Sequence, residues 1–197
     1  MNDIDSALSD IQRIRDRLAD GTRFEGFAPG IVALTGVFAF ALSAWQVHGR
    51  SASLLAWIIL ALVCALMIGT EAIVRARAVH RAMADRLINS TLQRFLPVGL
   101  AGAIVGFVIL LQFPEQVRLL PGLWQLLMAV GICAALGNLP AAMRWPAAFY
   151  FVTGTISLAV SGDALIDTAW LMGLPFGIGQ FLVAVTLYVS SGRTPHD

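Results

Sequence analysis

Two long apolar runs decide the fold of this chain. The first, IVALTGVFAFALSAW, extends from Ile31 to Trp45, and the second, ASLLAWIILALVCALMIG, extends from Ala52 to Gly69. Neither run contains Arg, Asp, Glu or His, and neither alternates apolar and polar residues as the strands of a membrane barrel do. A helix needs about 20 residues to cross the hydrocarbon core of a bilayer. We therefore predict that both runs are transmembrane helices.

The composition of the whole chain supports the same environment. Its 197 residues are 58% hydrophobic and 13% charged, whereas a soluble domain is about 45–50% apolar and about 25% charged. Charged surface is too scarce to cover a soluble globule with this much apolar area. We predict an integral membrane protein. The formal net charge of +1 provides no basic field, so we expect no nucleic-acid partner.

Four further stretches without Arg, Asp, Glu or His follow the first two. Short segments containing Pro or Gly separate most of them, and short linkers favour antiparallel neighbours. The prediction is an all-α bundle of six transmembrane helices within residues 26–192, followed by a tail at 193–197. The expected spans are 28–47, 52–71, 95–113, 121–138, 145–161 and 168–190.

The arginines indicate how this bundle is oriented. If the N-terminus is cytoplasmic, only Arg50 and Arg118 fall on the opposite face, and all other arginines lie inside. Positively charged loops stay in the cytoplasm, so we predict that both termini are cytoplasmic. Tryptophans favour membrane interfaces. In this orientation the outer ends of spans hold Trp45, Trp57, Trp124 and Trp170, and an inner end holds Trp145.

Residues 1–25 form a predicted cytoplasmic segment with an amphipathic helix over 3–19. Its apolar stripe recurs at helical spacing and consists of Ile4, Leu8, Ile11, Ile14 and Leu18. Interfacial helices that lie on lipid are usually basic, whereas acidic residues outnumber arginines here. Contact with lipid and contact with protein both remain open for this helix.

The second span is expected to continue as a cytoplasmic helix over 71–88. This extension carries Arg75, Arg77 and Arg81. One interpretation is a solvated loop that follows the positive-inside rule. The other is a protein-binding surface, on which the acidic N-terminal helix docks through Ile11 and its apolar neighbours. Exposed ion pairs contribute only about 0–1 kcal/mol each, so apolar contacts would have to provide most of the stability.

The last span contains the most unusual local sequence, GLPFGIGQ. Pro175 interrupts the helix before Gln180, and interrupted helices can form ligand sites near the bilayer midplane. Pro and Gly in membrane helices also serve packing alone. The small-residue pairs Gly102–Gly106 and Gly173–Gly177 allow close helix packing, either within the bundle or between subunits. Other polar residues in the spans are expected to form hydrogen bonds between helices.

Residues that bind metals or cofactors form no recognisable motif. His48, His80 and His196 lie in three different segments, and the predicted spans contain no Arg, Asp, Glu or His except Glu71 at the cytoplasmic end of the second span. Nucleotide-binding and hydrolase motifs are also missing from the sequence. We therefore expect no metal, no cofactor and no catalytic residue.

The second half of the chain resembles a bacterial family of small, uncharacterised six-helix membrane proteins. The resemblance rests on LPGLWQLLMAVGI from Leu120, SGDAL from Ser161 and GLPFGIGQ, and on the start IQRIRDRLADGTRFEGFAPG. It implies the six-helix topology and a bacterial inner membrane. It implies no activity. Many members of the family have His where this chain has Gln180, so a metal or proton role does not transfer to this position.

These patterns predict a non-catalytic membrane module. The leading hypothesis is a sensory, regulatory or accessory subunit that acts through another protein or through a second copy of the chain. The alternative is a transporter or channel for a small neutral or lipophilic solute, with Pro175 and Gln180 as its ligand-binding residues.

Overall fold

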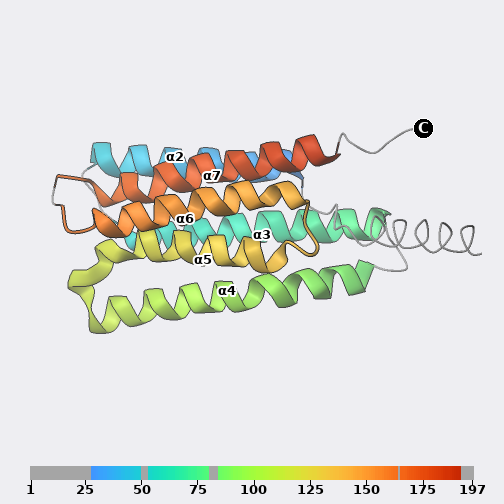
Figure 1. The fold of residues 1–197 in the computed structure, drawn as a ribbon. Coiled ribbons are helices and arrows are strands. Elements are labelled where there is room, and N and C mark those ends of the chain that lie inside the picture. The colour runs from blue at the N-terminus through green and yellow to red at the C-terminus, as the bar shows by residue number, and fades with distance from the viewer. Residues whose placement is uncertain (1–27, 50–52, 80–83, 164, 192–197) are drawn as a thin grey trace, which may run out of the picture.

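The structure is a computed structural model that describes residues 28–49, 53–79, 84–163 and 165–191, and all regular structure in these ranges is helical (Figure 1). The predicted N-terminal helix and the tail at 193–197 lie outside the described residues. The elements, in chain order, are α2 (Pro29–Gly49), α3 (Leu54–Val79), α4 (Ala84–Gln112), η1 (Pro114–Leu119), α5 (Leu120–Ala135), η2 (Ala141–Met143), α6 (Arg144–Ala159) and α7 (Thr168–Ser191).

Five of the described helical segments are long and apolar enough to cross a membrane: α2, α3, α4, η1 with α5, and α7. The remaining expected span, 145–161, corresponds to α6, which has 16 residues. The cytoplasmic extension of α3 is shorter than expected. The helix ends at Val79, and residues from Ala84 onward belong to α4. The chain has to reverse direction here because the next span re-enters the bundle from the same end.

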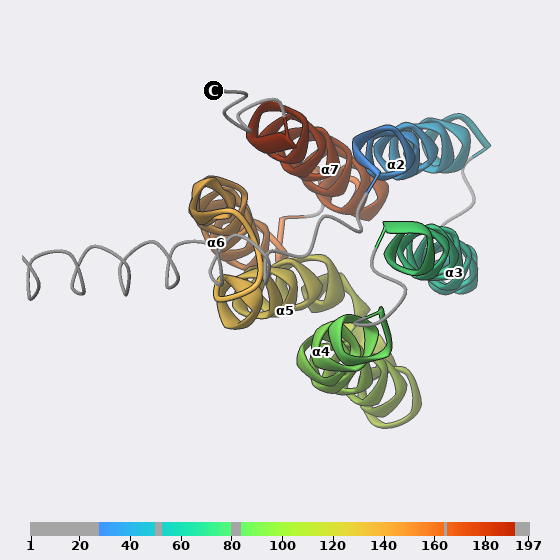
Figure 2. The same ribbon diagram turned by 90° about the vertical axis from the view of Figure 1, so that its right-hand side faces the viewer.

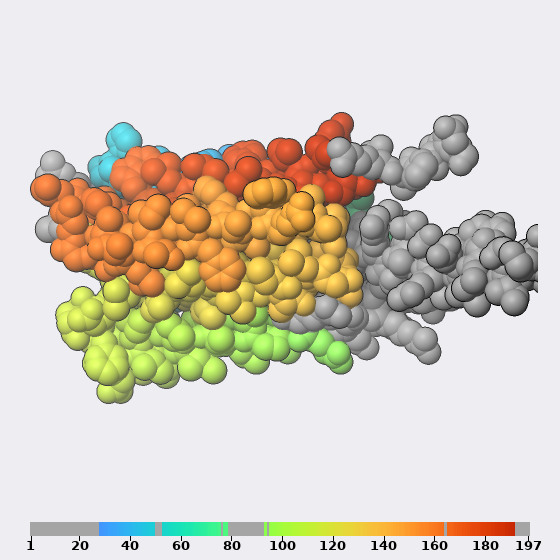
Figure 3. All heavy atoms as spheres, viewed as in Figure 1, coloured from blue at the N-terminus to red at the C-terminus, as the bar shows by residue number. Residues whose placement is uncertain are grey.

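Figure 2 shows the helices end-on as a ring in which α2 lies between α7 and α3, and α4 lies between α3 and α5. The most extensive helix pair is α2 with α7, the first and last described helices of the chain. Figure 3 shows α6 between α7 and α5 on one side of the molecule. Helices α2, α5, α6 and α7 therefore form the central unit, to which α3 and α4 are added at one side.

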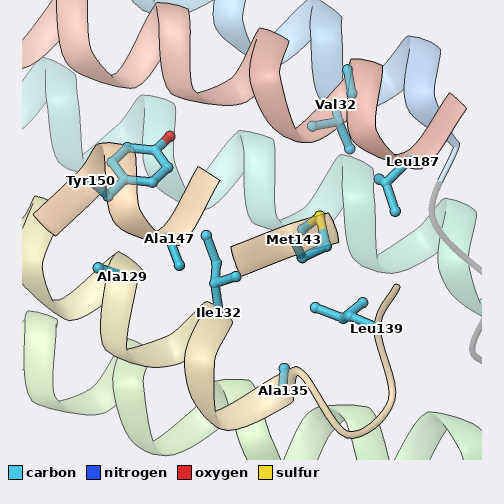
Figure 4. Packing of buried hydrophobic residues seen from close by; sticks show 10 residues of the cluster. Val32, Ala129, Ile132, Ala135, Leu139, Met143, Ala147, Tyr150 and Leu187 are labelled. Atoms are coloured by element: carbon cyan, nitrogen blue, oxygen red, sulfur yellow. The ribbon is translucent and has the colours of Figure 1, made fainter. Parts of the chain in front are cut away.

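The main core lies inside this central unit, toward the end where α2 begins (Figure 4). Helix α6 contributes Tyr150 and Ala147, and the turn before it contributes Met143 and Leu139. Tyr150 is the largest fully buried side chain. The remaining buried members are Val32, Ala129, Ile132, Ala135, Ala184 and Leu187.

Helices α3 and α4 are held along one side only. In their most apolar windows, 11% of the α3 residues and 6% of the α4 residues are buried, compared with 33% to 39% in the other three spans. Large apolar side chains such as Leu66 and Phe107 are more than 60% exposed. A surface of this kind suits hydrocarbon, where exposure of apolar side chains carries no cost.

The tryptophans divide into two groups. Trp45 and Trp145 are 59% and 67% exposed, as side chains of an interfacial belt would be. Trp57 is buried instead, and its indole N–H donates to the Gln46 side chain at 3.0 Å. The Gln46 amide donates in turn to the Ser53 carbonyl at 2.8 Å. Trp57 thus fixes the corner between α2 and α3, because a buried indole N–H needs a partner.

Glycines bring the backbones of α2 and α7 into contact. A Cβ at Gly36 would lie 2.9 Å from the Gly177 carbonyl oxygen, and one at Gly177 would lie 2.5 Å from the Phe40 ring. A Cβ at Gly173 would overlap Ser43. Larger residues at these positions would force the two helices apart, which explains why small residues recur along this face.

We predict opposite effects for one substitution at two glycines. Gly173→Ala should lower the free energy of unfolding by about 1–3 kcal/mol, because its methyl group overlaps Ser43 and approaches the Ala39 carbonyl. Gly99→Ala in α4 should leave stability unchanged or raise it by up to about 1 kcal/mol, because nothing lies within 4 Å. Reversible unfolding in mixed micelles measures both, and equal destabilisation would contradict the packing described for α7.

Candidate functional site

Helix α7 continues through Pro175 as one helix, so the expected interruption is absent and only one backbone hydrogen bond is lost. A side chain from α5 replaces that bond. Proline has no backbone N–H, so the carbonyl of Leu171, four residues earlier, loses its helical partner. The Gln125 amide donates to this carbonyl at 3.0 Å and to the Ser157 hydroxyl at 3.1 Å. Gln125 is fully buried. One amide group therefore joins α5, α6 and α7 at the point where α7 needs a hydrogen-bond donor.

Two other side chains bind carbonyls just before this point. Ser43 of α2 donates to the Ala169 carbonyl at 2.8 Å. Arg118 of η1 donates to the Ile166 carbonyl at 2.7 Å and also to the Asp163 carbonyl. The start of α7 and the loop before it are thus held from three sides, by α2, by η1 and by α5.

The Pro175–Gln180 segment faces Tyr150, near the middle of the helices. The Tyr150 ring is 0% exposed, and its hydroxyl lies over Gly179, where a Cβ would overlap it. This hydroxyl has no hydrogen-bond partner of good geometry among the described residues, although the Gln180 side chain lies close enough to interact with it. The buried Tyr150 hydroxyl and the half-buried Gln180 side chain therefore lie side by side near Pro175.

Close packing surrounds this pair. Phe176 contacts the Tyr150 ring with centroids 5.7 Å apart, and Phe181 stacks on Phe40 at 6.2 Å. On the α2 side, a Cβ at Gly36 would lie 3.2 Å from Gln180 Cβ. Neighbouring side chains fill the space that a larger residue would need at Gly177 and Gly179, so the small size of these glycines allows the helices to touch.

The glycine pair of α4 contacts α5. The Trp124 indole N–H donates to the Gly102 carbonyl at 3.0 Å. A Cβ at Gly106 would lie 3.1 Å from the same indole ring. Gly102 and Gly106 thus form a shallow surface for Trp124, whereas Gly173 and Gly177 face α2. Both glycine pairs contact helices of the same chain.

Most threonines in the spans do not connect helices, contrary to expectation. Each donates its hydroxyl to a carbonyl three or four residues earlier in its own helix, as Thr35, Thr153, Thr155 and Thr186 do. Ser43, Gln46 and Gln125 make the bonds between elements. Sequence reasoning did not single out Gln125. The signal was available, because Pro175 leaves the Leu171 carbonyl without a partner.

The predicted cytoplasmic binding residues fall only partly within the described chain. Arg75 and Arg77 are exposed on the last turns of α3. Arg75 pairs with Glu71 one turn earlier, with 2.7 Å between Nε and Oε1. The structure describes only the part of this surface that belongs to α3, because the other predicted residues lie outside the described ranges: Ile11, Ile14, Leu18 and Arg81.

The chemistry of the described residues matches no metal site, since none of their His, Cys, Asp and Glu side chains form a group of three that could hold an ion. Comparisons with protein-family models, with curated proteins and with solved structures found no match. The resemblance to small bacterial six-helix proteins therefore remains a prediction.

We predict that Gln125 and Pro175 are energetically coupled. Gln125→Leu should lower the free energy of unfolding by about 0.6–1.7 kcal/mol, the range of hydrogen bonds between membrane helices. In a Pro175→Ala background the loss should be smaller, because the backbone N–H at position 175 can then bind the Leu171 carbonyl. Unfolding of the two single variants and the double variant in mixed micelles measures this coupling.

Thr186→Val provides the matched control, since its hydroxyl binds only its own helix at 2.7 Å and should matter little. An equal cost of Gln125→Leu in both backgrounds would refute the coupling.

Proposed function

We propose that this chain is a non-catalytic integral membrane protein, a sensory, regulatory or accessory subunit that acts through a protein partner at its cytoplasmic end. The observation that carries the proposal is the shape of that end. Helices α3 and α4 project beyond the other helices where α2 begins and α7 ends (Figure 1). A projecting pair of helices with exposed Arg75 and Arg77 offers a surface that the bundle itself does not use.

The topology we propose has six transmembrane helices in a bacterial inner membrane, with both termini cytoplasmic. Helix α6 has 16 residues, yet η2 precedes it directly, so helical structure extends from Ala141 to Ala159. Figure 1 supports the even number, because the start of α2 and the end of α7 lie at the same end of the bundle. The arginine distribution supports the assignment of that end to the cytoplasm.

The buried polar groups support a structural use of the interior. Gln125 and Ser43 bind backbone carbonyls of α7, and Gln46 binds the indole of Trp57. Each of these side chains holds elements of the bundle together. The surfaces left for binding are the lipid-facing sides of α3 and α4 and the projecting end.

Photocrosslinking tests this proposal in native membranes. A photoreactive residue at Arg77 should give a protein adduct of discrete mass, because this position lies on the projecting end. The same residue at Gln116, exposed in η1 at the other end of the bundle, is the matched control and should give none. Mass spectrometry of the adduct separates a different protein from a second copy. Equal yields at both positions, or no adduct at Arg77, would contradict the proposal.

A transporter or channel for a small neutral or lipophilic solute is the second candidate. One observation favours it: the buried hydroxyl of Tyr150, without a well-aligned partner, lies beside Gln180, about one turn after Pro175 in α7. A solute with a hydrogen-bonding group could interact with both side chains. The close packing of Gly173 and Gly177 against α2 favours the first proposal instead.

For this second candidate we expect neutral lipophilic solutes with a carbonyl or hydroxyl group to raise the unfolding temperature of the purified protein. The shift should disappear in Gln180→Leu and in Tyr150→Phe, because each variant removes one polar group. Thr155→Val, whose hydroxyl binds its own helix, should keep it. A panel that produces no shift in the wild-type protein would eliminate the candidate.

A further inference from the structure

The last turns of α3 extend past the start of α2. These antiparallel neighbours are joined at the opposite end through Gln46, which binds both Ser53 and Trp57. Helix α2 has 21 residues and α3 has 26. The difference corresponds to about 7 Å of helix at 1.5 Å per residue. The turn that ends at Val79 therefore lies beyond Pro29, in agreement with Figure 1.

Exposed apolar and basic side chains lie at the base of this projecting turn and on it. Val74, level with the start of α2, is 63% exposed, and Arg77 on the turn itself is exposed. Arg75 is half exposed although it pairs with Glu71. Over Glu71–Val79 the net charge is +1. A docked segment would need a matching apolar stripe and excess negative charge.

The chain itself supplies such a segment nearby. Ala28 is buried, and its carbonyl accepts hydrogen bonds from the Ile31 and Val32 backbone N–H groups, so the chain enters the bundle next to the end of α3. The preceding residues include the predicted amphipathic helix at 3–19, and residues 1–25 carry a net charge of −2. Eight residues lie between position 19 and Ala28, and the nine Cα-to-Cα steps of an extended chain span up to about 30 Å, enough to reach α3.

We propose that residues 3–19 dock on the projecting end of α3 in the same molecule. The apolar stripe that contains Ile11, Ile14 and Leu18 covers Val74, and the acidic residues face Arg77. The inference rests on the proposed function, because this surface is the one assigned to the protein partner. The N-terminal segment then competes with the partner, and release of the segment makes the surface available.

Limited trypsin digestion of the full chain tests the docking. The protein is placed as one chain per nanodisc in an equal mixture of phosphatidylcholine and phosphatidylglycerol, and cleavage after Arg75 and Arg77 is followed by mass spectrometry. The triple variant Ile11→Ser, Ile14→Ser, Leu18→Ser should be cleaved about tenfold faster, because cleavage follows the population of the undocked state. Ser6→Ala with Ser9→Ala, on the opposite face of the predicted helix, should leave the rate unchanged.

Deletion of residues 2–20 should give the same cleavage rate as the triple variant. Two independent changes keep the test valid if one of them alters folding. Equal cleavage of wild type and both variants would overturn the docking. Faster cleavage of the wild-type chain in phosphatidylcholine alone would also overturn it, because lipid would then be the occupant. So would protection of Arg75 and Arg77 that appears only with two chains per disc, because the segment would then come from a second copy. Equal acceleration of cleavage in the control variant Ser6→Ala with Ser9→Ala would contradict the role of the apolar stripe.

The photocrosslinking experiment separates this inference from the proposed function. If docking and partner binding share the surface, the triple serine variant should increase the adduct yield at Arg77. If an adduct forms at Arg77 while trypsin detects no docking, the proposed function stands and the N-terminal inference falls.

Discussion

The backbone contact between α2 and α7 is the constraint on which the bundle depends. Gly36, Gly173 and Gly177 allow these helices to approach so closely that a Cβ would meet backbone or a ring. Dispersion and hydrogen bonding, which require close approach, stabilise helix pairs in lipid, because hydrophobic burial contributes little there. The short distance also places Ser43 within reach of the Ala169 carbonyl. The central unit could not close with larger residues at these positions.

A second constraint follows from the lack of water in the hydrocarbon. A free carbonyl costs several kcal/mol there, so an interrupted helix needs a donor from a neighbour. Gln125 is that donor for Leu171, and its second bond to Ser157 adds α6 to the same junction. The hydrogen bond that Pro175 removes from α7 is thus replaced by a connection between three helices. Its chemistry is that of a structural joint. The polar atoms that suggest a ligand are Gln125 Oε1 and the Tyr150 hydroxyl, which are buried without a well-aligned hydrogen-bond partner among the described residues.

The all-helical bundle and its five candidate membrane-spanning segments could be predicted because runs without charged residues mark lipid-embedded segments directly. The boundary between α3 and α4 was harder to predict from the sequence. Residues on both sides of 80–83 have the same helical pattern, and no Pro or Gly in this stretch indicates where one helix ends. The sequence also indicated the unusual segment from Pro175 to Gln180. The roles of Tyr150, Trp57 and Trp124 could not be predicted, because an aromatic residue at a given depth can face lipid or a neighbouring helix.

The pairing of the first described helix with the last has a consequence for biosynthesis. When α2 leaves the ribosome, its main partner is still more than a hundred residues from being made, because α7 begins only at Thr168. Until then the small-residue face of α2 and its Ser43 hydroxyl contact lipid or the insertion machinery. Assembly of the central unit is therefore expected to finish only after α7 has entered the membrane and packed against α2.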